Sequence, residues 1–391
     1  MGLALACELC PLVLPVPDGV KITTLPLCPS CAEGTMVIVQ SQQETEATTP
    51  GPDLLMMTRE NPPSFEFLPE PIAVDEVNGF ISDSFPGATD DESEMLSNRI
   101  NRLTPLILAT QVIADIKSTG AEVDEATVIQ RFGEIGRQYR KELRKIEDRE
   151  GIGRGLRLSD GFPKETGDHL RVWTRLFIGG DPNDLMMDRR GVGQQLGIMD
   201  VIDGEERVVA LGKAAGVFLP IDLHSDPEIQ MKDHHGLGKT VRMPVWIERK
   251  SVDSILKFIT EAARAEMRWM QDVLGQTEGL AVSTTDISDQ EVQAVIEGRR
   301  SQSRWLDRSG ETVLKVAKSE AEEEGLSGED RDERIEEALA SKILPTVTST
   351  LGRLKELGLV FPVKRGRSTL YKATPAGKDW IGEWDKEPDD S

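Results

Sequence analysis

The four cysteines of the chain all fall within its first 31 residues, in two pairs: Cys7 with Cys10, and Cys28 with Cys31. Each pair has the CxxC spacing at which two thiolates bind one face of a tetrahedral zinc ion, and two pairs complete the site. Four protein ligands leave no position for water, so we expect the Zn²⁺ to be structural rather than catalytic. The alternative is two redox-active thiol pairs, although no thioredoxin-like βαβ pattern surrounds either one.

A second group of side chains with metal-ligating chemistry lies between residues 222 and 240. Histidine and carboxylate ligands suit several transition metals, and the sequence GLGKT at 236–240 resembles the end of a phosphate-binding P-loop. That motif requires glycine at position 233, where the chain has aspartate. No established catalytic spacing fits, so we predict that the protein is not an enzyme. The side chains of this group are Asp222, His224, Asp233, His234 and His235.

The elements expected around the cysteines are short strands followed by a tether. Apolar segments at 21–25 and 35–39 have the length of zinc-ribbon strands, which predicts a ribbon over residues 1–39. Residues 40–96 are acidic and rich in proline, so we predict a disordered linker that cannot bury enough apolar surface to fold. Apolar islands at 54–57, 65–68 and 80–81 either pack on the body or bind a protein partner. Because Lys21 is the only cation between the cysteines, the ribbon favours a protein partner over DNA.

The middle of the chain is predicted to be helical, with a helical body over 97–250 and long amphipathic helices over 251–325, the first of which runs from Ser251 to Leu274. These long helices either form a homodimer interface or pack within one chain. Within the body, a helix from about 125 to 150 is basic on its outer face. Such a charge run is either a solvated face or a contact for nucleic acid. Its cations are Arg131, Arg137, Arg140, Lys141, Arg144, Lys145 and Arg149.

Residues 326–385 combine a helix with a basic hairpin. Val347, Leu351 and Leu354 recur at the spacing of one helix face, and Gly358 stands where the helix can end in the left-handed conformation. An apolar strand follows at 359–361, and a return strand is expected at 369–373. The tip between them contains three cations and a glycine, a composition that suits the phosphate backbone. The cations are Lys364, Arg365 and Arg367.

This order resembles the winged helix-turn-helix domains of the MarR, PadR and ArsR families of transcription regulators. Those families share the pattern "L..L...GLV.......Y.LT.AG", and this chain has Ala373-Thr374 where Leu-Thr is usual. The resemblance implies a winged helix over 326–385 that binds double-stranded DNA. It places Thr348, Ser349 and Arg353 in the major groove, and the three cations of the tip on phosphates or in the minor groove. Winged helices also bind proteins, so an adaptor without DNA affinity is the alternative function.

A second copy of this pattern is predicted over 165–220. Residues 193–219 align with 354–380 without a gap, which places Leu196-Gly197-Ile198 on Leu357-Gly358-Leu359 and Ala215-Gly216 on Ala376-Gly377. Its turn, at 203–206, is acidic and would be repelled by phosphates. The alternative is that such patterns recur by chance.

Charge and composition constrain the whole molecule. With 46 Lys and Arg against 68 Asp and Glu, the net charge is −22, so any contact with DNA must be local. No apolar run has the length that crosses a membrane. Few cysteines, confined to one candidate metal site, indicate a reducing compartment, and we predict a cytoplasmic, nucleoid-associated protein. The expected fold is mainly α with small β (α+β): a zinc ribbon, a helical body and a C-terminal winged helix.

Overall fold

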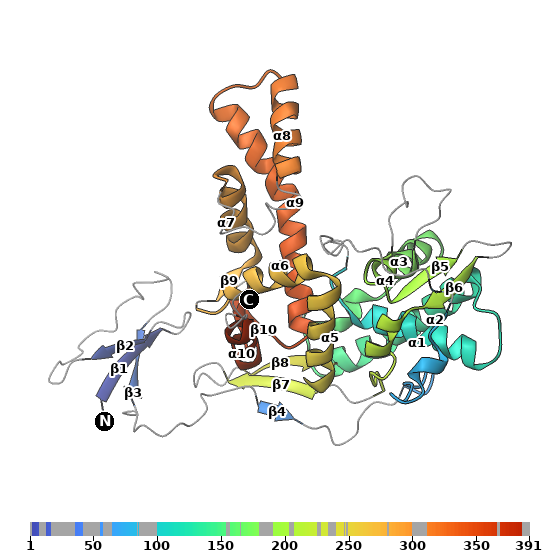
Figure 1. Ribbon diagram of the computed structural model, residues 1–391. Helices are drawn as coiled ribbons and strands as arrows, with labels where there is room; N and C mark the ends of the chain where they lie inside the picture. The colour runs from blue at the N-terminus through green and yellow to red at the C-terminus, as the bar shows by residue number, and fades with distance from the viewer. Residues whose placement is uncertain are drawn as a thin grey trace, which may run out of the picture.

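The computed structural model describes residues 2–7, 13–16, 36–41, 55–57, 65–83, 85, 100–153, 157–164, 166–179, 191–202, 207–224, 228–233, 240–245, 247, 249–279, 281–298, 311–365 and 368–384. As predicted from the sequence, the fold is mainly helical with small antiparallel sheets (Figure 1). Within these described ranges, three of the sheets are three-stranded and one is two-stranded.

A first unit, unit 1, spans residues 104–217. It consists of α1 (Thr104–Ser118), α2 (Glu125–Arg149), η2 (Leu158–Gly161), α3 (Asp168–Ile178), α4 (Val192–Gln195), the hairpin β5 (Met199–Ile202) and β6 (Val208–Leu211), and η3 (Lys213–Val217). Almost all of α1 is buried, because its sequence TPLILATQVIADIKS is apolar on most sides. This helix lies at the centre of the hydrophobic core.

A second unit, unit 2, spans residues 264–384. It consists of α6 (Arg264–Gly275), β9 (Val282–Ser283), α7 (Thr284–Ile296), α8 (Glu311–Glu323), α9 (Glu329–Glu356), β10 (Val360–Arg365), β11 (Ser368–Ala373) and α10 (Pro375–Trp384). Its sheet has the order β10-β11-β9. Helix α8 and the first half of α9 project from the rest of the molecule as an arm (Figure 1). Because β9 pairs with β11, the predicted domain boundary at residue 326 falls inside this unit.

Helix α5 (Arg249–Ala262) precedes unit 2 and corrects one sequence-based expectation. The apolar pattern predicted a single helix from Ser251 to Leu274. The structure breaks it at Ala263, whose φ of −144° and ψ of 62° are not helical, and α6 begins at the next residue. The apolar period continues across the break because both helices bury one face in the same core.

In each unit a first helix is followed by a residue that pairs with the later hairpin, then by three α-helices and then by the hairpin. Asp124 and Ser283 are the N-caps of α2 and α7, and each accepts a hydrogen bond from a backbone N–H in the first turn. Asp124 bridges to Val208 of β6, and Ser283 pairs with Leu370 of β11. This arrangement extends back to α1, well before residue 165, where the sequence placed the start of a second copy.

The hairpins of the two units differ in length by one residue. Gly197 and Gly358 precede them with φ of 63° and 71°, a conformation that glycine adopts readily. Met199 pairs with Leu211 in unit 1, whereas Val360 pairs with Ala373 in unit 2. The ungapped match of Ala215-Gly216 with Ala376-Gly377 is therefore wrong by one residue.

The acidic segment after residue 40 is partly folded, which contradicts the prediction of a disordered linker for residues 55–57 and 65–83. Phe65 is only 1% exposed, and its ring meets that of Tyr139 edge to face at 5.1 Å. Leu68 and Val77 join the same core. Strand β4 (Leu55–Met57) pairs with β7 (Glu228–Asp233), which pairs in turn with β8 (Thr240–Val245). Burial of Phe65, Leu68 and Val77 offsets the ordering of a polar segment.

The N-terminal sheet consists of β1 (Gly2–Cys7), β2 (Val13–Val16) and β3 (Met36–Ser41), in the antiparallel order β2-β1-β3. Strand β3 overlaps the segment 35–39 that the sequence predicted as a strand. The other predicted strand, 21–25, lies outside the described residues.

Candidate nucleic-acid interface

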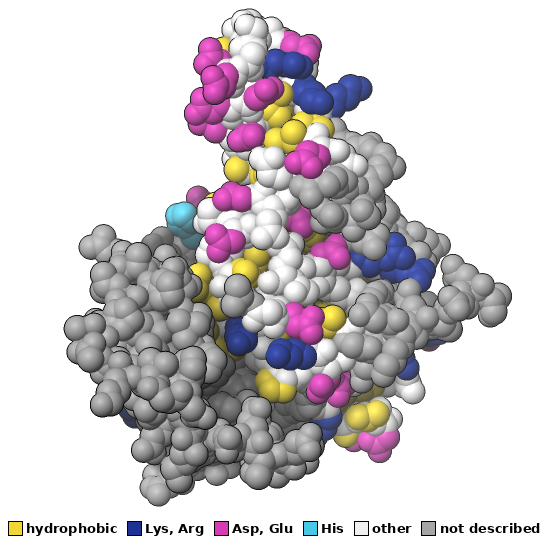
Figure 2. Space-filling view, turned by 90° about the vertical axis from the view of Figure 1, so that its left-hand side faces the viewer, with side chains coloured by type: hydrophobic (Ala, Val, Ile, Leu, Met, Phe, Trp, Pro, Cys, Tyr) yellow, Lys and Arg dark blue, Asp and Glu magenta, His cyan; other side chains and the backbone are white. Residues whose placement is uncertain are grey.

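Helix α9 has two halves with different surroundings. Its first half belongs to the projecting arm, which carries many acidic side chains (Figure 2). From residue 346 to residue 356 nearly every side chain is buried. Pro345, which has no N–H to donate to the helix, stands at the transition. The buried half immediately precedes the basic hairpin and contains three residues predicted to contact DNA.

Arg353 and Ser349 do not reach a DNA groove, so the prediction for these two residues is wrong. Arg353 is 0% exposed, and its Nη2 lies 2.5 Å from Oε1 of the equally buried Glu266. The guanidinium also donates to the carbonyl of Ile100 and to Oγ1 of Thr350. Ser349 is buried as well. Residues from two segments that are distant in the sequence cover this face of α9. The apolar periodicity within α9 does not indicate that they do so.

Residues 100–104 of the segment that leads into unit 1 cover the end of α9. The Nη1 of Arg102 donates to the carbonyl of Gly352 at 2.8 Å. The carboxylate of Glu356 accepts from the backbone N–H groups of Leu103 and Thr104 and from the Thr104 hydroxyl, and so caps the N-terminus of α1. We call this contact, which joins unit 2 to the segment that enters unit 1, the junction.

Burial changes the titration of the junction's charged groups. Desolvation raises the pKa of Glu356 and lowers the pKa of Arg102. The attraction between the two charges shifts each pKa in the opposite direction and so offsets part of the desolvation effect. Desolvation and the nearby Arg102 charge hold the pKa of Lys355 well below its usual value. Sequence reasoning missed these residues, because nothing local distinguishes a buried charge from a solvated one.

Of the remaining predicted DNA contacts, Thr348 lies on α9 and the other three belong to the hairpin sequence that follows it. Thr348 is exposed, and its hydroxyl donates to the carbonyl of Leu344 at 2.8 Å. In the hairpin, Lys364 pairs with Thr369 and Arg365 with Ser368, so both residues belong to the end of β10. Arg367 lies in the two-residue connection, outside the described residues, and the side chains of the other two cations are likewise not described.

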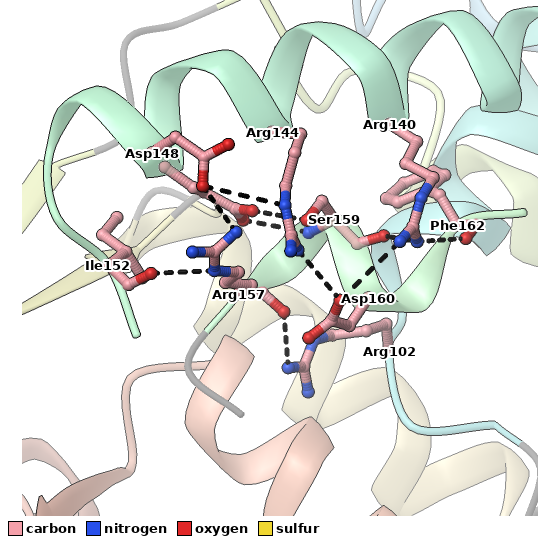
Figure 3. A network of polar contacts seen from close by, with 10 residues as sticks. Arg102, Arg140, Arg144, Asp148, Ile152, Arg157, Ser159, Asp160 and Phe162 are labelled. Carbon is pink, nitrogen blue, oxygen red and sulfur yellow. Dashed lines mark hydrogen bonds and ion pairs between the residues drawn. The ribbon is translucent and has the colours of Figure 1, made fainter. Parts of the chain in front are cut away.

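A second basic region lies along α2, where most inward-facing arginines are neutralised (Figure 3). Arg140 donates to the carbonyls of Ser159 and Phe162, and Arg144 lies 3.4 Å from Asp160. Arg157 pairs with Asp148 at 2.7 Å, and its carbonyl accepts from Arg102 of the junction. These arginines fasten the η2 segment to α2, so they are structural groups.

A groove of about 820 Å³ between α6 and α7 is unsuited to nucleic acid. Its lining contains carboxylates and amides but no cation, and phosphates would be repelled there. Glu291, fully buried, accepts from the amide of Gln276 at 3.1 Å. The lining residues are Gln271, Asp272, Gly275, Gln276, Asp289, Gln290, Glu291, Gln293 and Ala294.

The histidine and aspartate group has a structural role in its described part. The backbone N–H of His224 donates to Asp222 at 2.7 Å, and Nε2 of His224 lies 3.1 Å from the carbonyl of Pro69. The imidazole thus fastens the 65–83 segment to the body. Asp233 ends β7, whereas His234 and His235 lie outside the described residues.

For the cysteines, the structure gives one backbone position. Cys7 ends β1 and pairs with Met36, the first residue of β3, five positions after Cys31 in the chain. Cys10, Cys28 and Cys31 lie outside the described residues, within which no group of three His, Cys, Asp or Glu side chains could hold a metal ion. The zinc site stays a prediction.

Comparison of the chain with protein-family models, with curated proteins and with solved structures found no match. Among the helices in the described ranges, none has both the length and the apolar character required to cross a membrane.

Proposed function

We propose that the protein binds double-stranded DNA through unit 2 and acts, without enzymatic activity, as a cytoplasmic transcription regulator or transcription-associated factor. The observation that carries the proposal is the hairpin of β10 and β11, which follows α9 and has Lys364, Arg365 and Arg367 at its tip. The helices of unit 2, followed by this hairpin in the sheet order β10-β11-β9, support a winged-helix assignment in which the hairpin is the wing.

The burial of Arg353 and Ser349 limits what this surface can read. Contacts from hairpin cations to phosphates position a protein on DNA but carry no sequence information. Of the residues expected to face the major groove, only Thr348 is exposed. Unit 2 is therefore proposed to bind duplex DNA with weak sequence preference.

A gel-shift survey with random duplexes at about 50 mM salt tests the proposal, because non-specific binding is strongest at low salt. The full chain should bind, and the double variant Arg365→Glu, Arg367→Glu should not. Lys315→Glu with Lys318→Glu is the matched control, because it makes the same change of charge at two exposed positions of α8. Wild-type protein that shifts no duplex, or a hairpin variant that binds like the control, contradicts the proposal.

The burial of the second half of α9 favours one other function, an adaptor whose winged helices bind proteins. In an adaptor the basic hairpin would contact an acidic partner, and no duplex would be retained at any salt concentration. The same gel-shift survey separates the two functions.

We propose further that the four cysteines hold one structural Zn²⁺. The pairing of Cys7 with Met36 supports this, since it brings the end of β1 beside the strand that follows the second CxxC pair. Four thiolates are a complete tetrahedral donor set for zinc. Metal analysis should give one zinc per chain, lost in Cys7→Ser. Zinc retained after replacement of all four cysteines would place the metal elsewhere.

A further inference from the structure

The two units carry opposite charge patterns on equivalent elements. Helix α2 of unit 1 contains seven Lys and Arg, whereas the equivalent helix α7 of unit 2, with the sequence TTDISDQEVQAVI, contains none. The hairpins show the reverse: the connection of unit 1 is Asp-Gly-Glu-Glu at 203–206, and that of unit 2 is basic. A contact with phosphates therefore suits the hairpin in unit 2 and the helix in unit 1.

Two cations of α2 are set apart from the neutralised arginines of Figure 3. Arg137 and Lys141 are exposed, and within the described part of the chain neither has an ion-pair partner. They are one turn apart, about 6 Å along the helix axis. The nearest carboxylates are engaged: Glu134 accepts from Gln130 at 3.1 Å, and Glu142 pairs with Lys145 at 2.8 Å.

A third exposed cation comes from the loop that returns along α2. Lys164 follows Pro163, whose Cδ lies 3.7 Å from the position that a Cβ on Gly136 would take. The ring of Trp173 covers the same glycine, so the loop and α3 are held tightly against this part of α2. We call Arg137, Lys141 and Lys164 the α2 basic face. It is presented by a rigid, well-packed surface.

We propose that the α2 basic face is a second contact for the phosphate backbone of duplex DNA. The inference rests on the proposed function, since it assumes that duplex DNA is the ligand of the protein. A protein partner fits this face less well, because protein interfaces have an apolar centre. The large hydrophobic side chains that are exposed in the described residues are Val74, Ile296, Val316 and Leu344, and none of them lies on α2.

The test measures binding of the full chain to a fluorescent duplex of random sequence over a range of salt concentrations. Arg137→Glu with Lys141→Glu should weaken binding by at least about tenfold, and the slope of log K against log salt should become shallower by about 2. The control Lys315→Glu with Lys318→Glu should stay within about twofold of wild type, because α8 lies outside both surfaces. If charge reversal unfolds the protein, Arg137→Gln with Lys141→Gln should give a similar loss of slope.

The outcomes separate this inference from the proposed function. Wild-type protein that binds duplex, with an α2 variant that matches the control, overturns the inference and leaves the hairpin proposal standing. An α2 variant that loses binding while the hairpin variant keeps it supports the inference and overturns the hairpin proposal. Binding of polyglutamate through Arg137 and Lys141, with no binding of duplex, overturns both.

Discussion

The guanidinium of Arg353 donates to three acceptors inside the protein, on Glu266, Ile100 and Thr350. Removal of a charged pair from water is costly, and the cost is met only when each group keeps its partners. A sequence pattern records that position 353 is an arginine on one side of a helix. It does not record that Glu266, 87 positions away, lies opposite.

Arg353→Met should lower the free energy of unfolding by about 3–5 kcal/mol, because it leaves Glu266 buried without its cation. Urea unfolding of the variant measures the loss. The double variant Glu266→Leu, Arg353→Met should recover part of it, since no unpaired charge remains. Thr348→Ala, at an exposed position of the same helix, should change stability by less than about 0.5 kcal/mol. A loss below about 1 kcal/mol in Arg353→Met would contradict the structural role.

Lys355 should make stability depend on pH. Its pKa is lowered in the folded protein by burial and by Arg102, whereas the unfolded chain has a value near about 10.4. Between these two values the unfolded state binds more protons, so the contribution of Lys355 to the free energy of unfolding rises with pH.

The comparison with Lys355→Met isolates this effect. The difference in unfolding free energy, wild type minus variant, should increase as the pH is raised from about 6 toward about 9.5, below the range in which the tyrosines of the unfolded chain ionise. Urea unfolding at a series of pH values gives the difference directly. Parallel curves for the two proteins would show that Lys355 does not titrate in this way.

At the scale of elements, local sequence patterns predicted the structure correctly where it depends on residues that are close together in the chain. Gly358 ends its helix with positive φ, and the strands predicted around the basic tip are β10 and β11. The prediction of a single helix across Ala263 was wrong. A helix break that leaves the same face buried does not interrupt the apolar period of the sequence.

The linker prediction failed for a different reason. The prediction gave more weight to the acidic composition of the segment than to its few aromatic residues. In the structure, Phe65 packs in an apolar site beside Tyr139. The composition of a segment describes that segment alone. It does not show which surface of the rest of the protein the segment can cover.

Phe65→Ala should therefore destabilise the protein by about 3–5 kcal/mol, the cost of a large cavity in a core. Val74→Ala, in the same segment but at a side chain that is 76% exposed, should have an effect within about 0.5 kcal/mol. Thermal or urea unfolding compares the two variants. Equal, small effects would mean that the 65–83 segment is held only weakly on the body.

For the whole molecule, the sequence indicated a second copy of the pattern only from a helix end and the hairpin that follows it. The equivalence of α1 with α6 and of α2 with α7 became evident only from the pairing of Asp124 with Val208 and of Ser283 with Leu370. The joining of the units through Arg102, Arg353 and Glu356 could not be predicted, because it depends on contacts about 250 residues apart. Buried polar contacts of this kind fix the orientation of the two units.

This arrangement has a consequence for a chain with a net charge of −22. Diffuse repulsion opposes DNA binding, so the attraction must come from a few local cations and should be sensitive to salt.

The most direct test of DNA binding through the hairpin is the slope of log K against log salt for the full chain and for the variant Arg365→Glu, Arg367→Glu. The account predicts a clearly negative wild-type slope, and a slope shallower by about 2 in the variant, since about 0.9 is lost for each phosphate contact. Equal slopes and affinities for the two proteins, or no duplex binding by wild type at low salt, would contradict it.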